Sequence, residues 1–168
     1  MAVPRNSSAF HVNYIAIPVV SSDRREYLPI GFLNFETIVG NQLFIIPNGS
    51  LELFGILTSK VHMAWMRVIC GRLENGFRYA RNLIYNTFPF PNHNPKIEVT
   101  AQKILDARSN YPNSSLAELY DPNRMPQDLR KAHEENDRAV LDSYGFPKNI
   151  SESEIVAKLF EMYQDLTK

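Results

Sequence analysis

The sequence predicts an α+β protein, in which a small β-rich N-terminal part with one long helix precedes an all-α C-terminal part. Two observations support this fold class. Short apolar runs separated by turn residues fill the first half of the chain, whereas apolar residues recur at three- and four-residue spacing in the second half. The two patterns meet near Pro89, which interrupts both strands and helices. We therefore expect two domains, residues 1–91 and residues 92–168.

Several short runs in the N-terminal part are expected to form strands, because they are rich in β-branched and aromatic residues and end at turn residues. Pro18 should place the first run at a sheet edge or end it early, since proline cannot donate to the ladder. The segment Ser21–Arg25 is expected to form a polar turn. The expected strands are residues 13–20, 27–33, 43–46 and, more weakly indicated, 82–85.

One long helix is expected to begin at Ser50, whose hydroxyl suits an N-cap position. We expect this helix to end at Gly71 and to be followed by a polar loop with interleaved aromatic residues, Arg72–Tyr79. The helix would have one apolar face of about five turns that packs in the core. That face consists of Phe54, Leu57, Val61, Trp65 and Val68.

The C-terminal part is expected to contain four helices, because apolar residues recur there with helical spacing. Gly145 should end the third helix, and the pair Ser151 and Glu154 forms the capping box that begins the fourth. The first three are expected over residues 96–110, 114–120 and 126–144.

The net charge is zero, but the charges are unevenly distributed along the chain. Residues 1–91 carry eight basic and five acidic side chains, whereas residues 92–168 carry ten basic and thirteen acidic ones. Within residues 55–91 the basic side chains outnumber the acidic ones by five to one, and four of the five are arginines. Arginine suits phosphate and guanine, so this stretch is compatible with DNA binding. A surface of this charge is also common on proteins that bind no nucleic acid.

The sequence contains no motif of a catalytic or metal site. Glycine-rich phosphate loops, paired cysteines, a His-Glu-x-x-His motif and a nucleophile elbow are all missing. We expect Glu134, Glu135 and Asp137 to lie on a solvated helix face. The four histidines are expected to be structural or solvated residues: His11, His62, His93 and His133.

The remaining sequence features concern the cellular compartment. Cys70 is the only cysteine and is expected to be a small buried apolar residue, which fits a reducing, cytoplasmic environment. No window reaches the roughly 18 apolar residues that a membrane span requires. The N-terminus lacks the charged and apolar regions of a signal peptide. We therefore expect no membrane partner.

Several long blocks of the sequence resemble MmeI-like type II restriction-modification proteins. The blocks occur in the order expected for that family and cover most of residues 13–145. Together they are far more specific than a single short motif. They are Tyr14–Phe32, Phe54–Arg67, Cys70–Tyr79, Tyr85–Pro91, Ile104–Arg108, Ser115–Pro122 and Leu129–His133.

The resemblance implies a domain organisation and an activity that composition does not indicate. Members of this family join a nuclease, an S-adenosylmethionine-dependent adenine-N6 methyltransferase, a DNA target-recognition domain and a helical C-terminal end. This chain resembles only the last two parts, and it lacks both the Asn-Pro-Pro-Tyr-type motif and the glycine-containing cofactor loop. Adenine methylation requires the base to be flipped into such a pocket. We therefore expect a piece of the longer enzyme that neither methylates nor cleaves DNA and binds no cofactor. S-adenosylmethionine, together with Mg²⁺ for any cleavage, would belong to the parent protein.

The expected partner is double-stranded DNA, and two sets of residues are candidate contacts. Base edges in the major groove are recognised by arginine, asparagine and glutamate side chains, while other polar residues bind phosphate. The long helix would support both sets, and Phe77 and Tyr79 are expected to pack in the core. The base-reading candidates are Arg72, Glu74, Asn75 and Arg78. The phosphate candidates are Ser21, Ser22, Arg24, Arg25, Lys60 and Arg81.

An alternative function remains open. The acidic helical residues 92–168 could form a protein-docking or structural bracing module that does not touch DNA. Its partner would be the methyltransferase body of the parent chain. Apolar surface that this body normally covers would then favour self-association of the isolated piece.

Overall fold

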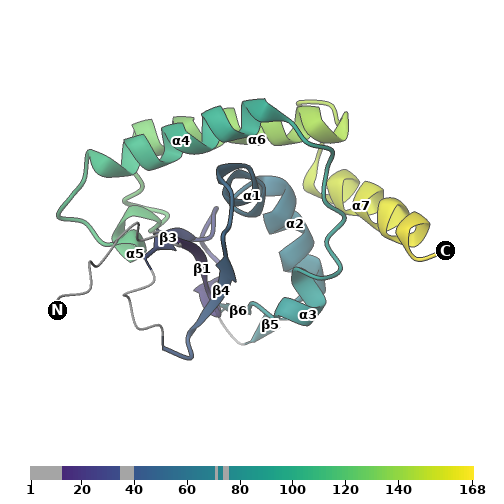
Figure 1. Ribbon diagram of the computed structural model, residues 1–168, viewed down its shortest axis with the longest axis horizontal. Helices are drawn as coiled ribbons and strands as arrows, with labels where there is room; N and C mark the ends of the chain where they lie inside the picture. The colour runs from purple at the N-terminus through teal and green to yellow at the C-terminus, as the bar shows by residue number, and fades with distance from the viewer. Residues whose placement is uncertain (1–12, 35–39, 71, 74–75) are drawn as a thin grey trace, which may run out of the picture.

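The computed structural model describes residues 13–34, 40–70, 72–73 and 76–168, and within them the fold is α+β, as predicted (Figure 1). The strands form two small sheets. They are β1 (Tyr14–Pro18), β2 (Val20–Ser22), β3 (Gly31–Leu33), β4 (Leu43–Pro47), β5 (Arg72–Leu73) and β6 (Gly76–Arg78). The helices are α1 (Leu51–Leu57), α2 (Lys60–Ile69), α3 (Arg81–Ile84), α4 (Pro95–Ser109), α5 (Leu116–Leu119), α6 (Gln127–Tyr144) and α7 (Glu152–Leu166).

Both sheets are antiparallel and are joined through Val19. The first has the order β3-β1-β4, and the second has the order β2-β6-β5. Pro18 is the last residue of β1, which is the central strand of its sheet, so the proline ends the strand as expected without placing it at an edge. The amide of Val19 donates to the Gln42 carbonyl at 2.9 Å, and its carbonyl accepts from the Tyr79 amide at 2.7 Å. Val19 is therefore hydrogen-bonded to segments beside both sheets.

The single long helix predicted from Ser50 is wrong, because the chain breaks into α1 and α2 at Thr58 and Ser59. Ser50 does cap α1, accepting from the Leu53 amide at 3.0 Å. The Ser59 hydroxyl then donates to the carbonyl of Ile56 at 2.7 Å and begins a new helix as the N-cap of α2. A hydroxyl that binds nearby backbone groups competes with continued helix in this way. Val68, expected in the core, is 52% exposed.

Four shorter segments also differ from the prediction. Residues 82–85 were expected to form a strand, but α3 occupies most of them. The expected turn Ser21–Arg25 and loop Arg72–Tyr79 both contribute strands, because β2 pairs with β6 and β6 pairs with β5. Of residues 27–33 only Gly31–Leu33 form a strand. For β2 and β6, pairing between segments more than 50 residues apart outweighs the local turn and loop pattern.

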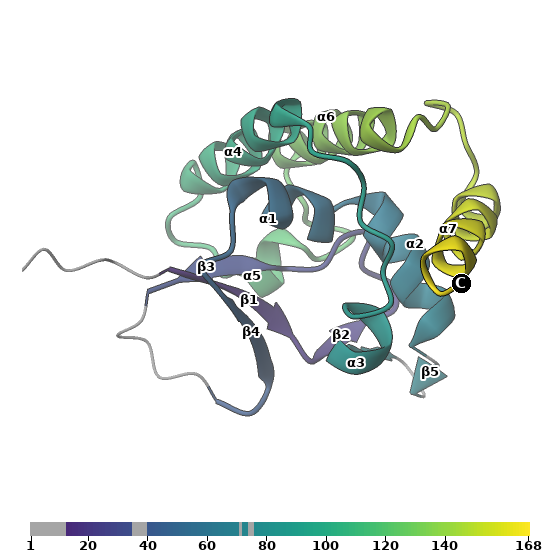
Figure 2. The same ribbon diagram turned by 45° about the vertical axis from the view of Figure 1, so that its right-hand side comes forward.

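The helices of the C-terminal part agree with the sequence pattern. Gly145 ends α6 in the left-handed conformation, at a φ of 68°. Ser151 and Glu154 form the predicted capping box of α7. Figure 2 shows α4 and α6 side by side above α1, with α7 against α2. No helix in the described part of the chain is long and apolar enough to cross a membrane.

One apolar core runs through both halves of the chain. Phe54 and Leu57 of α1 belong to the same buried cluster as Ile97 and Ile104 of α4. Gly55 allows this close approach, since a Cβ atom added there would lie 2.6 Å from Cγ2 of Ile97. The β-rich part is therefore packed directly against the helical part, which fixes the position of the second sheet relative to α6 and α7.

Candidate nucleic-acid interface

Arg78 projects from the second sheet into solvent. The register pairs it with Val20, which is 58% exposed, whereas the neighbouring pair Phe77 and Ser21 is buried. Because successive side chains of a strand point to opposite faces, Arg78 and Val20 share the solvent face while Phe77 and Ser21 face the core. Phe77 and Tyr79 are buried, as predicted. The strand thus presents a guanidinium from a rigid support.

Arg81 adds a second exposed arginine, at the first position of α3. Its guanidinium carbon lies 5.9 Å from the centre of the Phe44 ring, within the range of a cation–π contact. Its Nε donates to Oδ1 of Asn82 at 3.4 Å. Neither partner carries a charge, so the charge of Arg81 is free to attract an anion.

The segment after β2 carries two more arginines, and we call Ser22–Glu26 the arginine turn. The Arg24 amide donates to the Ser22 hydroxyl at 3.3 Å, and the Arg24 side chain is exposed. Arg25 is half-buried, and its Nη1 donates to the Ser21 hydroxyl at 3.2 Å. Ser21 is only 4% exposed, so its hydroxyl supports Arg25 in this structure rather than facing a ligand.

No acidic side chain among the described residues pairs with the arginines around the second sheet. Within the described part of the chain, Arg24, Arg25, Arg78 and Arg81 form no ion pair with a carboxylate. A polyanion could therefore bind them without displacing an internal partner. Arg67 and Arg130 differ, since they pair with Glu152 and Glu26.

The remaining candidates divide between two places. The structure describes only the backbone of Arg72, which lies opposite Phe77, while Glu74 and Asn75 lie outside the described residues. Lys60 begins α2, and its amide donates to Asp137 of α6. The ten residues of α2 span about 15 Å. The structure therefore separates Lys60 from the arginines that follow the other end of α2.

Asp137 contradicts the expected solvated helix face, since it is only 5% exposed. Its carboxylate accepts from the Tyr27 hydroxyl and from the Lys60 amide, both at 2.7 Å. Burial raises the pKa of Asp137 to about 6, although these two donors oppose the rise. The spacing offered one signal, because Asp137 follows His133, also buried, by four residues and so lies on the same side of the helix.

His62 and His133 are buried structural residues, as expected, whereas His11 lies outside the described residues. His62 contacts the Tyr79 hydroxyl at 3.0 Å, and burial lowers the pKa of His62 to about 3. His133 contacts the Tyr120 hydroxyl at 2.6 Å, and burial lowers its pKa well below the usual value. Both rings are therefore neutral near pH 7. In the described ranges no three His, Cys, Asp or Glu side chains gather as metal ligands.

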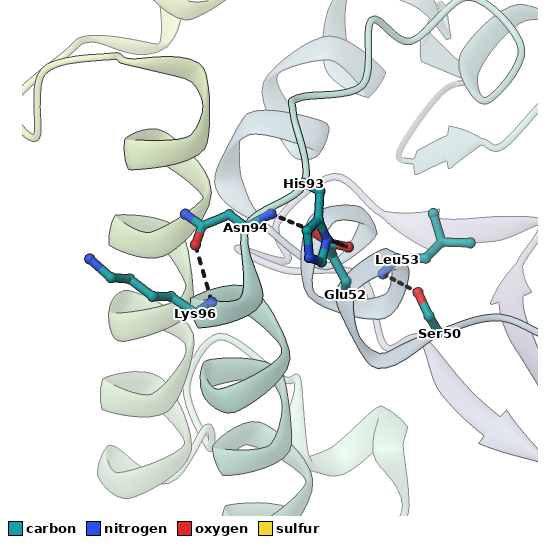
Figure 3. A network of polar contacts seen from close by, with 6 residues as sticks. All are labelled: Ser50, Glu52, Leu53, His93, Asn94 and Lys96. Carbon is teal, nitrogen blue, oxygen red and sulfur yellow. Dashed lines mark hydrogen bonds and ion pairs between the residues drawn. The ribbon is translucent and has the colours of Figure 1, made fainter.

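His93 is the exposed histidine, and it helps to join the two halves of the chain (Figure 3). Glu52 of α1 accepts from the Asn94 amide and contacts Nδ1 of His93, both at 2.7 Å. The hydrogen bond to Glu52 raises the pKa of His93. Asn94 in turn caps α4 by accepting from the Lys96 amide at 3.1 Å. Glu52 thus holds the beginning of α4 against α1.

Two family models, a relative and a solved structure match this chain. Residues 3–92 match the family described as "MmeI, target recognition domain", and residues 90–168 match "MmeI, C-terminal domain". The chain is 38% identical to DNA methyltransferase A of Bacillus subtilis (strain 168) over 161 residues, which cover 93% of this chain and 18% of that protein. It is also similar to a solved structure of the type IIL restriction-modification enzyme MmeI in complex with DNA, with a TM-score of 0.88 and 47% identity. That match covers 92% of this chain and 21% of the other, so the chain spans about a fifth of these relatives.

Proposed function

This chain belongs to the MmeI family, and on that premise we propose that it recognises and positions duplex DNA for an adenine-N6 methyltransferase of a restriction-modification system. The observation that carries the proposal is the set of arginines around the second sheet that have no carboxylate partner among the described residues. All three exposed arginines stand on defined structure: Arg24 on the arginine turn, Arg78 on β6 and Arg81 at the start of α3. This matches what a DNA interface requires, namely cations on a rigid support.

Within this function the two candidate sets have different tasks. Arg78 follows the segment of Arg72, Glu74 and Asn75, and these four side chains would contact base edges in the major groove. Arg24, Arg25 and Arg81, with Ser22, would contact phosphates. Ser21 would act through Arg25, and Lys60 would contact a phosphate away from the arginines, beside α6. The helical residues 92–168 would brace the recognition part.

The methyl transfer itself belongs, in this proposal, to the rest of a longer chain. S-adenosylmethionine and any Mg²⁺ would bind there, because this sequence has no glycine-containing cofactor loop and its described residues gather no metal ligands. We expect the 168-residue chain to neither methylate nor cleave DNA. Its own residues bind and orient the duplex, so that a target adenine can be flipped elsewhere.

Binding of this chain to a mixed-sequence duplex, followed by fluorescence anisotropy between about 50 and 200 mM salt, tests the proposal. Several phosphate contacts would weaken binding by a decade or more over this range. Arg81→Gln should reduce the slope of log K against log salt by about one, as expected for one lost phosphate contact. Arg124→Gln is the matched control, since Arg124 is exposed between α5 and α6. Equal slopes for both variants would remove Arg81 from the interface, and no binding at low salt would contradict the proposed function.

A second candidate function, protein docking, is favoured by exposed apolar residues. Val68 on α2, Leu83 on α3 and Leu166 on α7 are 52%, 56% and 73% exposed. Exposed apolar side chains mark a protein interface where they form a contiguous patch. The methyltransferase body of a longer chain would cover it, and isolated copies would self-associate through it. Concentration-dependent sedimentation without any DNA binding would support this function over the first.

A further inference from the structure

The arginine turn is held in place mainly by residues of the C-terminal helices. Glu26 forms an ion pair with Arg130 of α6. Tyr27, the residue directly after the turn, donates its hydroxyl to Asp137 of α6 and stacks on His133 with ring centres 4.2 Å apart. The turn therefore contacts a helix more than one hundred residues later in the chain, through one exposed ion pair and one buried anchor.

A second set of contacts reaches the turn from α7. The Arg67 guanidinium of α2 donates through Nη1 to Glu152 at 2.7 Å and through Nη2 to the Arg25 carbonyl at 3.4 Å. Glu152 is in the first turn of α7. One guanidinium thus connects α7 to the backbone of the arginine turn, and its planar shape fixes both directions at once.

These contacts hold a turn whose two arginines form no ion pair with a carboxylate of the described residues. Arg24 has no carboxylate partner among the described residues, and Arg25 uses only a hydroxyl. Two acids near the turn have other partners: Glu26 pairs with Arg130, and Glu152 pairs with Arg67. The third, Asp23, is exposed beside Arg24 and forms no ion pair among the described residues.

We propose that Glu152 and Glu26 are positioning residues for DNA binding, through which α6 and α7 hold the arginine turn so that Arg24 and Arg25 reach adjacent phosphates. This inference rests on the proposed function. It assigns the C-terminal helices a part in DNA affinity that does not require them to contact DNA. Rigid placement raises affinity because the turn need not be ordered when the duplex binds.

The sign of the effect of Glu152→Gln separates this role from simple electrostatics. Removing a carboxylate near a DNA surface lowers repulsion, so charge alone predicts tighter binding. Loss of positioning predicts weaker binding instead, by up to about fivefold if the contact has the strength of an exposed ion pair. It also predicts a smaller slope of log K against log salt, by about one for a phosphate contact that is no longer made.

Glu161→Gln provides the matched control, because Glu161 is an exposed acid of the same helix with no ion pair. Anisotropy titrations of the 168-residue chain with a mixed-sequence duplex would compare wild type, Glu152→Gln, Glu26→Gln and Glu161→Gln over a salt series. We expect weaker binding and a smaller slope for the first two variants only, with circular dichroism confirming an unchanged fold. If Glu152→Gln and Glu26→Gln bind as tightly as Glu161→Gln and keep the wild-type slope, the positioning role is wrong while the proposed function stands. If wild type shows no salt-dependent binding, the proposed function fails and the positioning role fails with it.

Discussion

Replacing Gly55 with alanine tests the close approach of α1 to α4 and α6, on which the joint core of the two halves depends. The added Cβ would lie 2.6 Å from Cγ2 of Ile97, 2.9 Å from Oδ1 of Asn136 and 3.2 Å from Cβ of Ala101. Ordinary carbon contacts lie at about 3.5–4.0 Å, so α1 would have to move by roughly 1 Å. That movement also disturbs the hydrogen bond from Asn136 Nδ2 to the Gly55 carbonyl, at 2.8 Å.

Opposing effects set the change in the free energy of unfolding that Gly55→Ala causes. Overpacking of a dense core costs about 1–3 kcal/mol, and the weakened hydrogen bond costs about 1 kcal/mol. Alanine stabilises the helix by about 1 kcal/mol relative to glycine, because its helix propensity is higher. We therefore expect Gly55→Ala to lower the free energy of unfolding by about 1–3 kcal/mol.

Urea denaturation followed by the fluorescence of Trp65, the only tryptophan, would measure this change. Gly40→Ala is the control, since an added Cβ there meets nothing within 4 Å, and its effect should stay within about 0.5 kcal/mol. Helix propensity alone predicts that Gly55→Ala is stabilising. A variant as stable as wild type, or more stable, would refute the packing argument.

Two further predictions concern pH. Because burial raises the pKa of Asp137 to about 6 from an ordinary 3.8, the folded state binds an extra proton between these values. The stability of wild type relative to Asp137→Asn should therefore fall as pH rises from about 4 to 6, by roughly 3 kcal/mol in urea titrations; a constant difference would contradict this. The pKa of His93 is raised by Glu52, so the pair stabilises the fold below the ordinary pKa and loses this contribution as pH rises through the raised value. Glu52→Gln should lower the pKa of His93 in NMR titrations, and an unchanged pKa would show that the pair does not form in solution.

The helices of the C-terminal part could be predicted from the sequence because their signals are local. The capping box of Ser151 and Glu154 and the left-handed Gly145 act within one turn of the helix ends that they define. Ser50 is a local signal of the same kind. The family blocks likewise follow from residue order alone, and the matches to the target-recognition and C-terminal domains of the family confirm them.

The break between α1 and α2 could not be predicted, because the apolar spacing from Phe54 to Trp65 is nearly helical across it. Besides the local cap of Ser59, the break exposes the Lys60 amide, which donates to Asp137 from 77 residues away. Asp137 resembles a solvated acid in the sequence because its hydrogen-bond donors come from distant segments. Its burial is tolerable only because the Tyr27 hydroxyl and the Lys60 amide donate to its carboxylate.

The sequence by itself determined the composition of the candidate interface: which residues are arginines, where helices end and which family the blocks resemble. Only the tertiary structure decided how those residues group. Pairing of β2 with β6 turned Arg78 outward and Ser21 inward, and the length of α2 separated Lys60 from Arg78 and Arg81. Glu26 and Glu152 pair with Arg130 and Arg67, and no described carboxylate pairs with Arg24 or Arg25. These outcomes depend on contacts between segments 50 to 100 residues apart, roughly the span of a domain, and such contacts leave no periodic signal in the local sequence.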